Sequence, residues 1–246
     1  MPCCARGLLP SGALGREVLA AEMERLRPWH EAFSDWSGGA APGSVLAETE
    51  IDGVRLHGRI GDVYPNGVGR VRFGELNGPT VIRDGLDWLL MRAAGLPQDM
   101  VQFHEVQAEG GRRYGPFVRE RITASQAREA LRALLHLRAE GLREPLPFAP
   151  YSGWEIHQGI DAYPRSVPRA RGRWHGGGGG YAECEDPALR QVLRGCDPFA
   201  EPALLHRFVE ASHTIYSAVT DGRVSPGVEP YKLDGLSSRH DAEDAA

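Results

Sequence analysis

Four arginines and one tryptophan cluster in the second half of the chain, where their chemistry suits single-stranded nucleic acid. They are Arg165, Arg169, Arg171, Arg173 and Trp174. Tyr163 and Tyr181 flank the cluster, and five consecutive glycines occupy residues 176–180. Guanidinium groups hold phosphate oxygens and aromatic rings stack on unpaired bases, so the cluster predicts a DNA contact beside a mobile loop. A solvated loop in an arginine-rich chain is the competing interpretation.

Two further basic pairs are candidates for the same contact. Arg70 and Arg72 alternate along a predicted strand, which places both side chains on one face, where they could line a channel. Arg112 and Arg113 lie at a predicted turn. The net charge of the chain is −5, however, and non-specific affinity for nucleic acid comes mainly from basic residues that neutralise phosphates. Any DNA contact is therefore expected to be local.

Asp62 and Glu75 are acidic residues on two neighbouring predicted strands and are candidates for a metal site. Two nearby carboxylates can bind Mg²⁺ weakly through water, and Glu31 on the first predicted helix could approach them. A nuclease mechanism that also needs a lysine is excluded by composition, because the chain has 27 arginines and one lysine, Lys232, near its C-terminal end. We interpret these residues as turn and surface acids and expect neither a metal site nor a catalytic residue.

Other binding chemistries find no matching pattern. The nine histidines are scattered without HxxxH or HExxH spacing, and the four cysteines form no CxxC unit, so zinc and disulfide frameworks are disfavoured. There is no GxxxxGK[ST] loop, and the glycine run lacks the strand-to-helix context of a nucleotide-binding turn. We therefore expect no cofactor in this chain.

The composition is that of one globular domain. The chain has 246 residues, of which 41% are hydrophobic and 25% are charged. It contains no apolar run long enough for a membrane span, and charged residues interrupt its first part where an export signal would lie. We expect a cytoplasmic protein that does not bind a membrane.

Hydrophobic periodicity predicts the elements that position these residues. The predicted helices cover residues 12–36, 79–95, 123–141, 189–193 and 203–219. The predicted strands cover residues 45–51, 54–63, 68–76, 101–106 and 114–121. Pro28 should bend or break the first helix, residues 142–150 should form an extended strap that packs or docks a subunit, and a short helix should follow Trp154. This order predicts an α+β fold around a mixed sheet.

Five stretches of the chain follow one another in the order of a known family. They are LPSGALG at 9–15, IDGVRLHG at 51–58, RVRFGEL at 70–76, GLREPLPF at 141–148 and DPALRQVLRGCD at 186–197. Together they resemble the C-terminal region of RecC, the gamma subunit of the RecBCD exodeoxyribonuclease V complex. The resemblance covers residues 7–219.

This resemblance implies a degenerate PD-(D/E)XK (restriction-endonuclease-like) fold, with a mixed central sheet flanked by helices. Active enzymes of that fold place a carboxylate on one strand, an acid on the next and a lysine two positions later. Here Gly61 stands at the first position with Asp62 one place late, which turns its side chain to the other face of a strand. Phe73 and Glu75 stand where the acid and the lysine should be. The resemblance thus implies an inactive nuclease-like domain.

RecC proteins are far longer than this chain, so the resemblance also implies how the chain is organised. Residues 1–10 are expected to be an N-terminal end at which a longer protein is cut short. Residues 11–220 are expected to be the nuclease-like domain, with a mobile Arg/Gly-rich loop at 163–181. Residues 221–246 are expected to be a disordered tail.

The function implied by the resemblance is that of a non-catalytic scaffold and DNA guide in double-strand-break repair by homologous recombination. The expected partners are RecB, RecD, DNA ends and single-stranded DNA, while ATP and Mg²⁺ serve other subunits. In that family the gamma subunit helps to split the duplex and takes part in recognising Chi. Two alternatives stay open: an active Mg²⁺-dependent nuclease domain, and a non-functional fragment of a split RecC gene.

Overall fold

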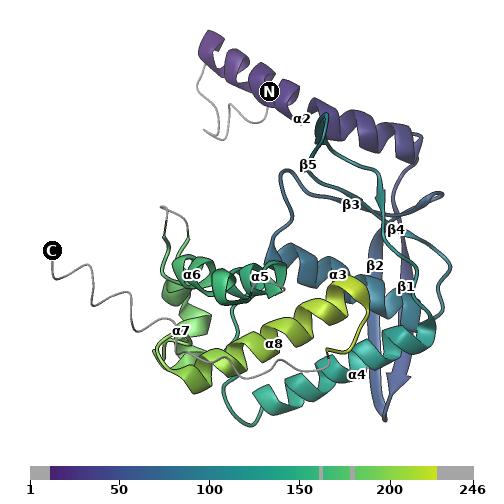
Figure 1. Ribbon diagram of the computed structural model, residues 1–246. Coiled ribbons are helices and arrows are strands. Elements are labelled where there is room, and N and C mark those ends of the chain that lie inside the picture. The colour runs from purple at the N-terminus through teal and green to yellow at the C-terminus, as the bar shows by residue number, and fades with distance from the viewer. Residues whose placement is uncertain (1–11, 161–162, 178–180, 226–246) are drawn as a thin grey trace, which may run out of the picture. The chain divides into compact units, whose positions relative to one another are not determined.

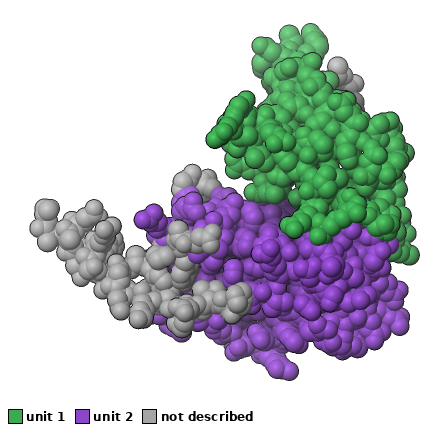
Figure 2. All heavy atoms as spheres, turned by 45° about the vertical axis from the view of Figure 1, so that its right-hand side comes forward, with its two compact units in different colours: residues 1–46, 59–76, 97–121 green, residues 47–58, 77–96, 122–246 purple. Residues whose placement is uncertain are grey.

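A computed structural model describes residues 12–160, 163–177 and 181–225 of the chain. It is α+β, as predicted, with a mixed five-stranded sheet flanked by helices (Figure 1). The chain divides into two compact units, which Figure 2 colours separately. Unit 1 holds residues 1–46, 59–76 and 97–121, and unit 2 holds residues 47–58, 77–96 and 122–246.

The strands of the large sheet lie in the order β1-β2-β3-β4-β7. Their bounds are β1 Gly43–Ile51, β2 Val54–Tyr64, β3 Gly67–Val71, β4 Met100–Phe103 and β7 Phe117–Val118. β2 pairs antiparallel with β3, with Val63 opposite Val68, whereas β3 and β4 are parallel, with Val68 opposite Met100. The predicted mixed sheet is therefore confirmed. A separate antiparallel hairpin joins β5 (Val106–Ala108) to β6 (Gly111–Arg113), at the predicted turn.

The third predicted strand is shorter than expected. β3 ends at Val71 rather than at residue 76, and Gly74 turns the chain with φ +106°, a value that favours glycine. Phe73 and Glu75 therefore lie beyond the strand, and the prediction of a strand through them is wrong. The predicted strand at 114–121 is likewise reduced to the two residues of β7.

Unit 1 has an aromatic core between α2 (Gly12–Ser37) and the sheet. Trp29 and Phe103 are buried in it, and the ring centroid of Phe33 lies 5.2 Å from that of Phe103. Gly69 on β3 permits this packing, since a Cβ there would lie 2.8 Å from the ring of Trp36. Pro28 lies inside α2, so the helix is not broken there as one prediction allowed.

Unit 2 is built from helices α3 (Gly78–Ala93), α4 (Ala124–Gly141), α5 (Pro150–Gln158) and α8 (Pro202–Asp221), which pack on one another. Two of them begin with side-chain caps of the kind that polar residues before a helix predict. Asn77 accepts from the Thr80 N–H, and Thr123 forms a reciprocal capping box with Gln126. Among the described residues, no helix is long and apolar enough to cross a membrane.

The core of unit 2 lies where α5, α8 and α6 (Tyr163–Trp174) meet. Ile156, Ala170 and Phe208 are fully buried in this core. α3 approaches α8 closely at Gly85, where a Cβ would lie 2.5 Å from the Cβ of Val219. The prediction of a loop at 163–181 is wrong for residues 163–174, which are helical.

Of the other elements predicted after residue 142, some are confirmed and some differ in their bounds. α5 begins at Pro150, before rather than after Trp154, and the stretch at 145–149 is non-helical as predicted. η2 (Glu183–Glu185) and α7 (Pro187–Leu193) follow, the latter close to its predicted place. Asp221 ends α8, so the expected tail does not start there. The predicted N-terminal end at residues 1–10 lies outside the described residues. So does most of the predicted tail, from residue 226 to residue 246.

Candidate nucleic-acid interface

The arginines of the cluster lie on the outer face of α6. Arg165 and Arg169 are four residues apart, as are Arg169 and Arg173, so the three side chains share one side of the helix. Arg165, Arg169 and Arg171 are exposed, whereas Arg173 is half-buried. Val167 and other residues of the opposite side are buried in the core. Arg171 lies about 160° around the helix from Arg169 and from Arg173, on the other flank of the exposed surface. We call the exposed surface of α6 that carries Arg165, Arg169, Arg171 and Arg173 the arginine face.

Trp174 does not belong to this face. Its side chain is 4% exposed and lies in the core of unit 2, with its ring centroid 6.4 Å from that of Phe199. A ring buried in this way cannot stack on a base, which corrects the proposed role of Trp174 as a DNA contact. The reason is helical spacing, since residues 166, 170 and 174 point inward together.

Most charges of the arginine face are not neutralised by close ion pairs. Arg169 Nε lies 3.9 Å from Glu155 Oε2, at the outer limit for an ion pair. Within the described residues, Arg165 and Arg171 contact no acidic group at ion-pair distance. Exposed guanidinium groups in such a position can hold phosphate oxygens through paired hydrogen bonds. The arrangement thus suits a polyanion.

Two tyrosines lie beside the arginine face. The guanidinium carbon of Arg173 lies 5.4 Å from the ring centroid of Tyr151, and the rings of Tyr151 and Tyr181 lie 6.4 Å apart. Sequence reasoning named Tyr181 but missed Tyr151, which is distant along the chain and gave no signal. Tyr163, also named, begins α6.

The side chain of Tyr181 is held by a carboxylate. Its hydroxyl donates to Asp186 Oδ2 at 2.7 Å, and Asp186 also accepts from the Ala188 and Leu189 N–H groups at the start of α7. The bond to Asp186 is the main cause that raises the pKa of Tyr181 to about 12. The same bond lowers the pKa of Asp186. The bond thus fixes the Tyr181 hydroxyl as a donor to the Asp186 carboxylate.

A buried glutamate anchors this region to α5. The side chain of Glu183 accepts hydrogen bonds from the Tyr151 N–H at 2.8 Å, from the Ser152 N–H at 2.6 Å and from the Ser152 hydroxyl at 2.5 Å. Glu183 is 1% exposed. It satisfies the free N–H groups in the first turn of α5 and complements the positive end of the helix dipole. Tyr151 and the chain at 181–183 are thus fixed to each other.

The candidate metal-site acid Asp62 is used in an ion pair. Asp62 lies on β2 with φ +55°, and its Oδ2 is 2.9 Å from Arg70 Nη1, which also donates to the Gly61 carbonyl at 3.1 Å. The Arg70 side chain is only 13% exposed. These contacts direct Arg70 toward β2, which argues against its proposed role in lining an open channel. The neighbouring Arg72 is half-buried.

The other predicted nuclease positions do not converge with Asp62. Phe73 is 56% exposed, with the edge of its ring toward Trp29 at 5.9 Å between centroids. Glu75 and Glu31 are exposed. Across residues 12–160, 163–177 and 181–225, no group of three or more His, Cys, Asp or Glu residues has a geometry that could hold a metal ion.

The hairpin arginines are exposed but engaged. Arg112 Nε lies 3.0 Å from Glu105 Oε1, and the guanidinium carbon of Arg113 lies 5.5 Å from the ring centroid of Phe117. The first is a surface ion pair, which contributes little to stability, and neither contact removes the charge from solvent. These two residues remain weaker candidates than the arginine face.

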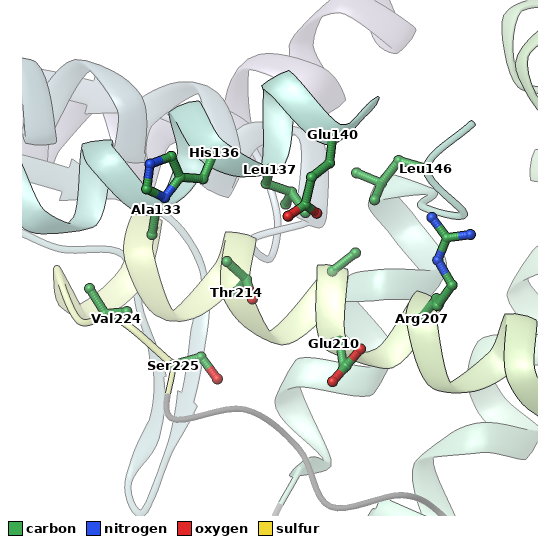
Figure 3. Close-up of a pocket in the computed structure, with 11 residues that line it drawn as sticks. Ala133, His136, Leu137, Glu140, Leu146, Arg207, Glu210, Thr214, Val224 and Ser225 are labelled. Atoms are coloured by element: carbon green, nitrogen blue, oxygen red, sulfur yellow. The ribbon is translucent and has the colours of Figure 1, made fainter. Parts of the chain in front are cut away.

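A cavity with both polar and apolar lining lies between α4 and α8 (Figure 3). Its volume is about 330 Å³, and Glu140 on α4 and Glu210 on α8 are among the residues that line it. Arg207 at its edge pairs with Glu144 at 2.7 Å, and Glu210 lies 3.2 Å from His206. Its charged groups are thus largely compensated by neighbours, which makes it a weaker candidate site than the arginine face.

The chain matches a known protein family. A family model described as the RecC C-terminal domain matches residues 3–161 of the chain. The match therefore includes β1 to α5 and ends before α6. No curated protein matches the chain.

Proposed function

The chain belongs to the RecC C-terminal domain family, and on this basis we propose that it is a non-catalytic scaffold and DNA-guiding domain of a RecBCD gamma subunit. It acts in the cytoplasm, in double-strand-break repair by homologous recombination. Its protein partners are RecB and RecD, and its nucleic-acid ligands are DNA ends and the single strands made from them. ATP hydrolysis and strand cutting belong to those partner subunits.

The non-catalytic part of the proposal is supported by the residues that stand at the positions of the nuclease active site and by their contacts. If the fold is a degenerate PD-(D/E)XK fold, Asp62, Phe73 and Glu75 occupy its catalytic strands or their ends. Asp62 is paired with Arg70, Phe73 packs against Trp29, and Glu75 stands where an active enzyme needs a lysine. Asp62 and Phe73 are thus engaged in structural contacts, and the lysine of the mechanism is missing.

The observation that carries the DNA-guiding part is the arginine face of α6. It places four arginines on the solvent-facing surface of one helix in a chain whose net charge is −5. Its inner side is fixed in the core of unit 2, so the guanidinium groups are presented from a rigid element. Phosphate contacts of this kind position DNA without reading its sequence, which is the behaviour required of a guide.

Replacing Arg165, Arg169 and Arg171 together by glutamine is expected to weaken binding to a forked DNA about tenfold. For a single strand, the slope of log binding constant against log salt concentration decreases in magnitude by about 0.7 for each phosphate contact that is lost. Losing three contacts should therefore decrease it by about 2 in this variant. Fluorescence anisotropy of labelled fork DNA over a salt series measures both quantities.

The matched control replaces Arg128, Arg138 and Arg143 by glutamine. These arginines are also exposed, and the same net charge is removed from α4 and the residues that follow it. This control is expected to leave the affinity within about twofold of the unchanged chain. Equal losses in the two triple variants would mean that net charge alone drives binding, and would overturn the guiding role of α6.

The unchanged chain is expected to cleave DNA no faster than a buffer control that contains Mg²⁺. Asp62→Ala and Glu75→Ala are expected to give the same result. Among the described residues neither carboxylate belongs to a metal-binding group, and the mechanism lacks its lysine. Gel assays with labelled fork DNA, in Mg²⁺ and in EDTA, measure this activity. Cleavage that requires Mg²⁺ and disappears in either variant would contradict the non-catalytic assignment.

A further inference from the structure

Tyr181 presents an aromatic ring to solvent while its other end is held. Its side chain is 55% exposed, and its hydroxyl donates to Asp186 at 2.7 Å. Two residues further on, Glu183 fixes the backbone to the first turn of α5. A ring restrained in this way loses little conformational entropy when a ligand stacks on it.

The ring of Tyr181 continues into the arginine face. Its centroid lies 6.4 Å from that of Tyr151 in an edge-to-face arrangement, and Arg173 lies over the Tyr151 ring. Arg169 stands one helical turn before Arg173. Phosphate-binding groups and an exposed aromatic surface thus adjoin within unit 2, which is the combination that single-strand-binding proteins use.

Two of the three acidic groups near Tyr181 are engaged in hydrogen bonds. Asp186 accepts the Tyr181 hydroxyl and two N–H groups of α7, and Glu183 is buried with three donors. Glu185, two residues after Glu183, is exposed to solvent. Tyr181, like any tyrosine at neutral pH, is uncharged, so no phenolate repels a phosphate backbone there.

From these contacts we infer that Tyr181, supported by Tyr151, is a base-stacking platform that makes the arginine face select single-stranded over duplex DNA. The inference rests on the proposed function, because it requires that the arginine face binds DNA. An unpaired base can leave its neighbours and stack on the exposed ring, whereas a paired base is already stacked in the duplex. Arg165, Arg169 and Arg171 hold the phosphates of either form.

The test compares the binding of an oligothymidine and of a duplex of equal length by fluorescence anisotropy, with the full chain. Tyr181→Ala is expected to weaken oligothymidine binding about tenfold and to leave duplex binding unchanged. Tyr181→Phe keeps the ring and is expected to remain within about threefold of the unchanged chain. Phe73→Ala removes an equally exposed ring from unit 1 and is expected to have no effect on either DNA.

A second readout reports stacking itself. When 2-aminopurine replaces one base of the single strand, its fluorescence changes as the base stacks. This change is expected with the unchanged chain and with Tyr181→Phe, and is expected to be lost with Tyr181→Ala. Circular dichroism of the three proteins confirms that each is folded.

The outcomes separate the inference from the proposed function. If the triple arginine variant weakens binding but Tyr181→Ala binds oligothymidine as the unchanged chain does, the stacking role is wrong and the guiding role stands. If Tyr181→Ala weakens both DNA forms equally, single-strand selection by this ring is also wrong. If the triple arginine variant changes nothing, the proposed function fails, and the inference fails with it.

Discussion

Glu183→Ala is expected to lower the free energy of unfolding by about 3 to 5 kcal/mol, a large fraction of the stability of a domain of this size. The carboxylate is 1% exposed and accepts three hydrogen bonds, from two backbone N–H groups and one hydroxyl. Alanine would leave these donors buried without partners, at about 1 to 3 kcal/mol for each unsatisfied group. Urea unfolding, followed by circular dichroism, measures the loss.

Two variants make this expectation specific. Glu183→Gln keeps an acceptor oxygen but removes the charge at the helix N-terminus, so its loss should be smaller than that of alanine. Glu185→Ala removes an exposed carboxylate two residues away and should change stability by less than about 0.5 kcal/mol. A loss below about 1 kcal/mol for Glu183→Ala would show that water can replace the carboxylate.

Gly85→Ala is expected to destabilise the protein by about 2 kcal/mol, although alanine is the better helix former. In an exposed helix the change would gain about 1 kcal/mol. At Gly85, however, the new methyl group would overlap the carbonyl oxygen of Val219 and lie 2.5 Å from its Cβ. The overlapping oxygen belongs to the backbone of α8 and cannot rotate away, so α3 and α8 must separate, and overpacking of this kind costs about 1 to 3 kcal/mol or more.

Gly172→Ala is the matched control for this prediction. Gly172 also lies in a helix, α6, but nothing stands within 4 Å of the Cβ that alanine would add. Its free energy of unfolding should rise by about 0.5 kcal/mol because only helix propensity changes. Thermal unfolding of both variants provides the comparison. Opposite signs are expected, and the same sign in both would mean that the contact between α3 and α8 yields easily.

The sequence predicts elements best where local chemistry and packing agree. Asn77 and Pro79 mark the start of α3, and Thr123 marks the start of α4, because caps act within a few residues. β3 was predicted too long because its apolar alternation continues past Val71 to Phe73. The chain in fact turns at Gly74, which the alternation alone does not indicate. Local signals therefore located the elements more reliably than their ends.

The helix α6 was missed because its propensity is poor. Pro168 and Gly172 both disfavour a helix interior, and the following glycines strengthened the interpretation as a loop. Packing of Val167 and Ala170 into the core outweighs that preference. The spacing of these two residues and of Trp174 was the available signal, since positions three and four apart share a helix face.

The contacts of the candidate site differ in how far they could be foreseen. The pairing of Asp62 with Arg70 follows only in part from the hairpin that turns at residues 65–66. Extending its register places Arg70 opposite Gly61, and Asp62 reaches Arg70 with a backbone φ of +55° that the sequence did not indicate. The meeting of Tyr151 with Tyr181 does not follow from any local pattern. It depends on the tertiary bond between Glu183 and the start of α5, which joins segments about thirty residues apart.

The family match stops at residue 161, but the folding unit does not. Ala149 and Ile156 belong to the matched part, and the core that covers them is supplied by later residues such as Phe208 and Val209. The segment from α6 to α8 therefore shares one hydrophobic core with the matched part and is not a separate domain. In a relative that ends at this boundary, the faces of α3 and α5 that α6 and α8 cover here would need another partner.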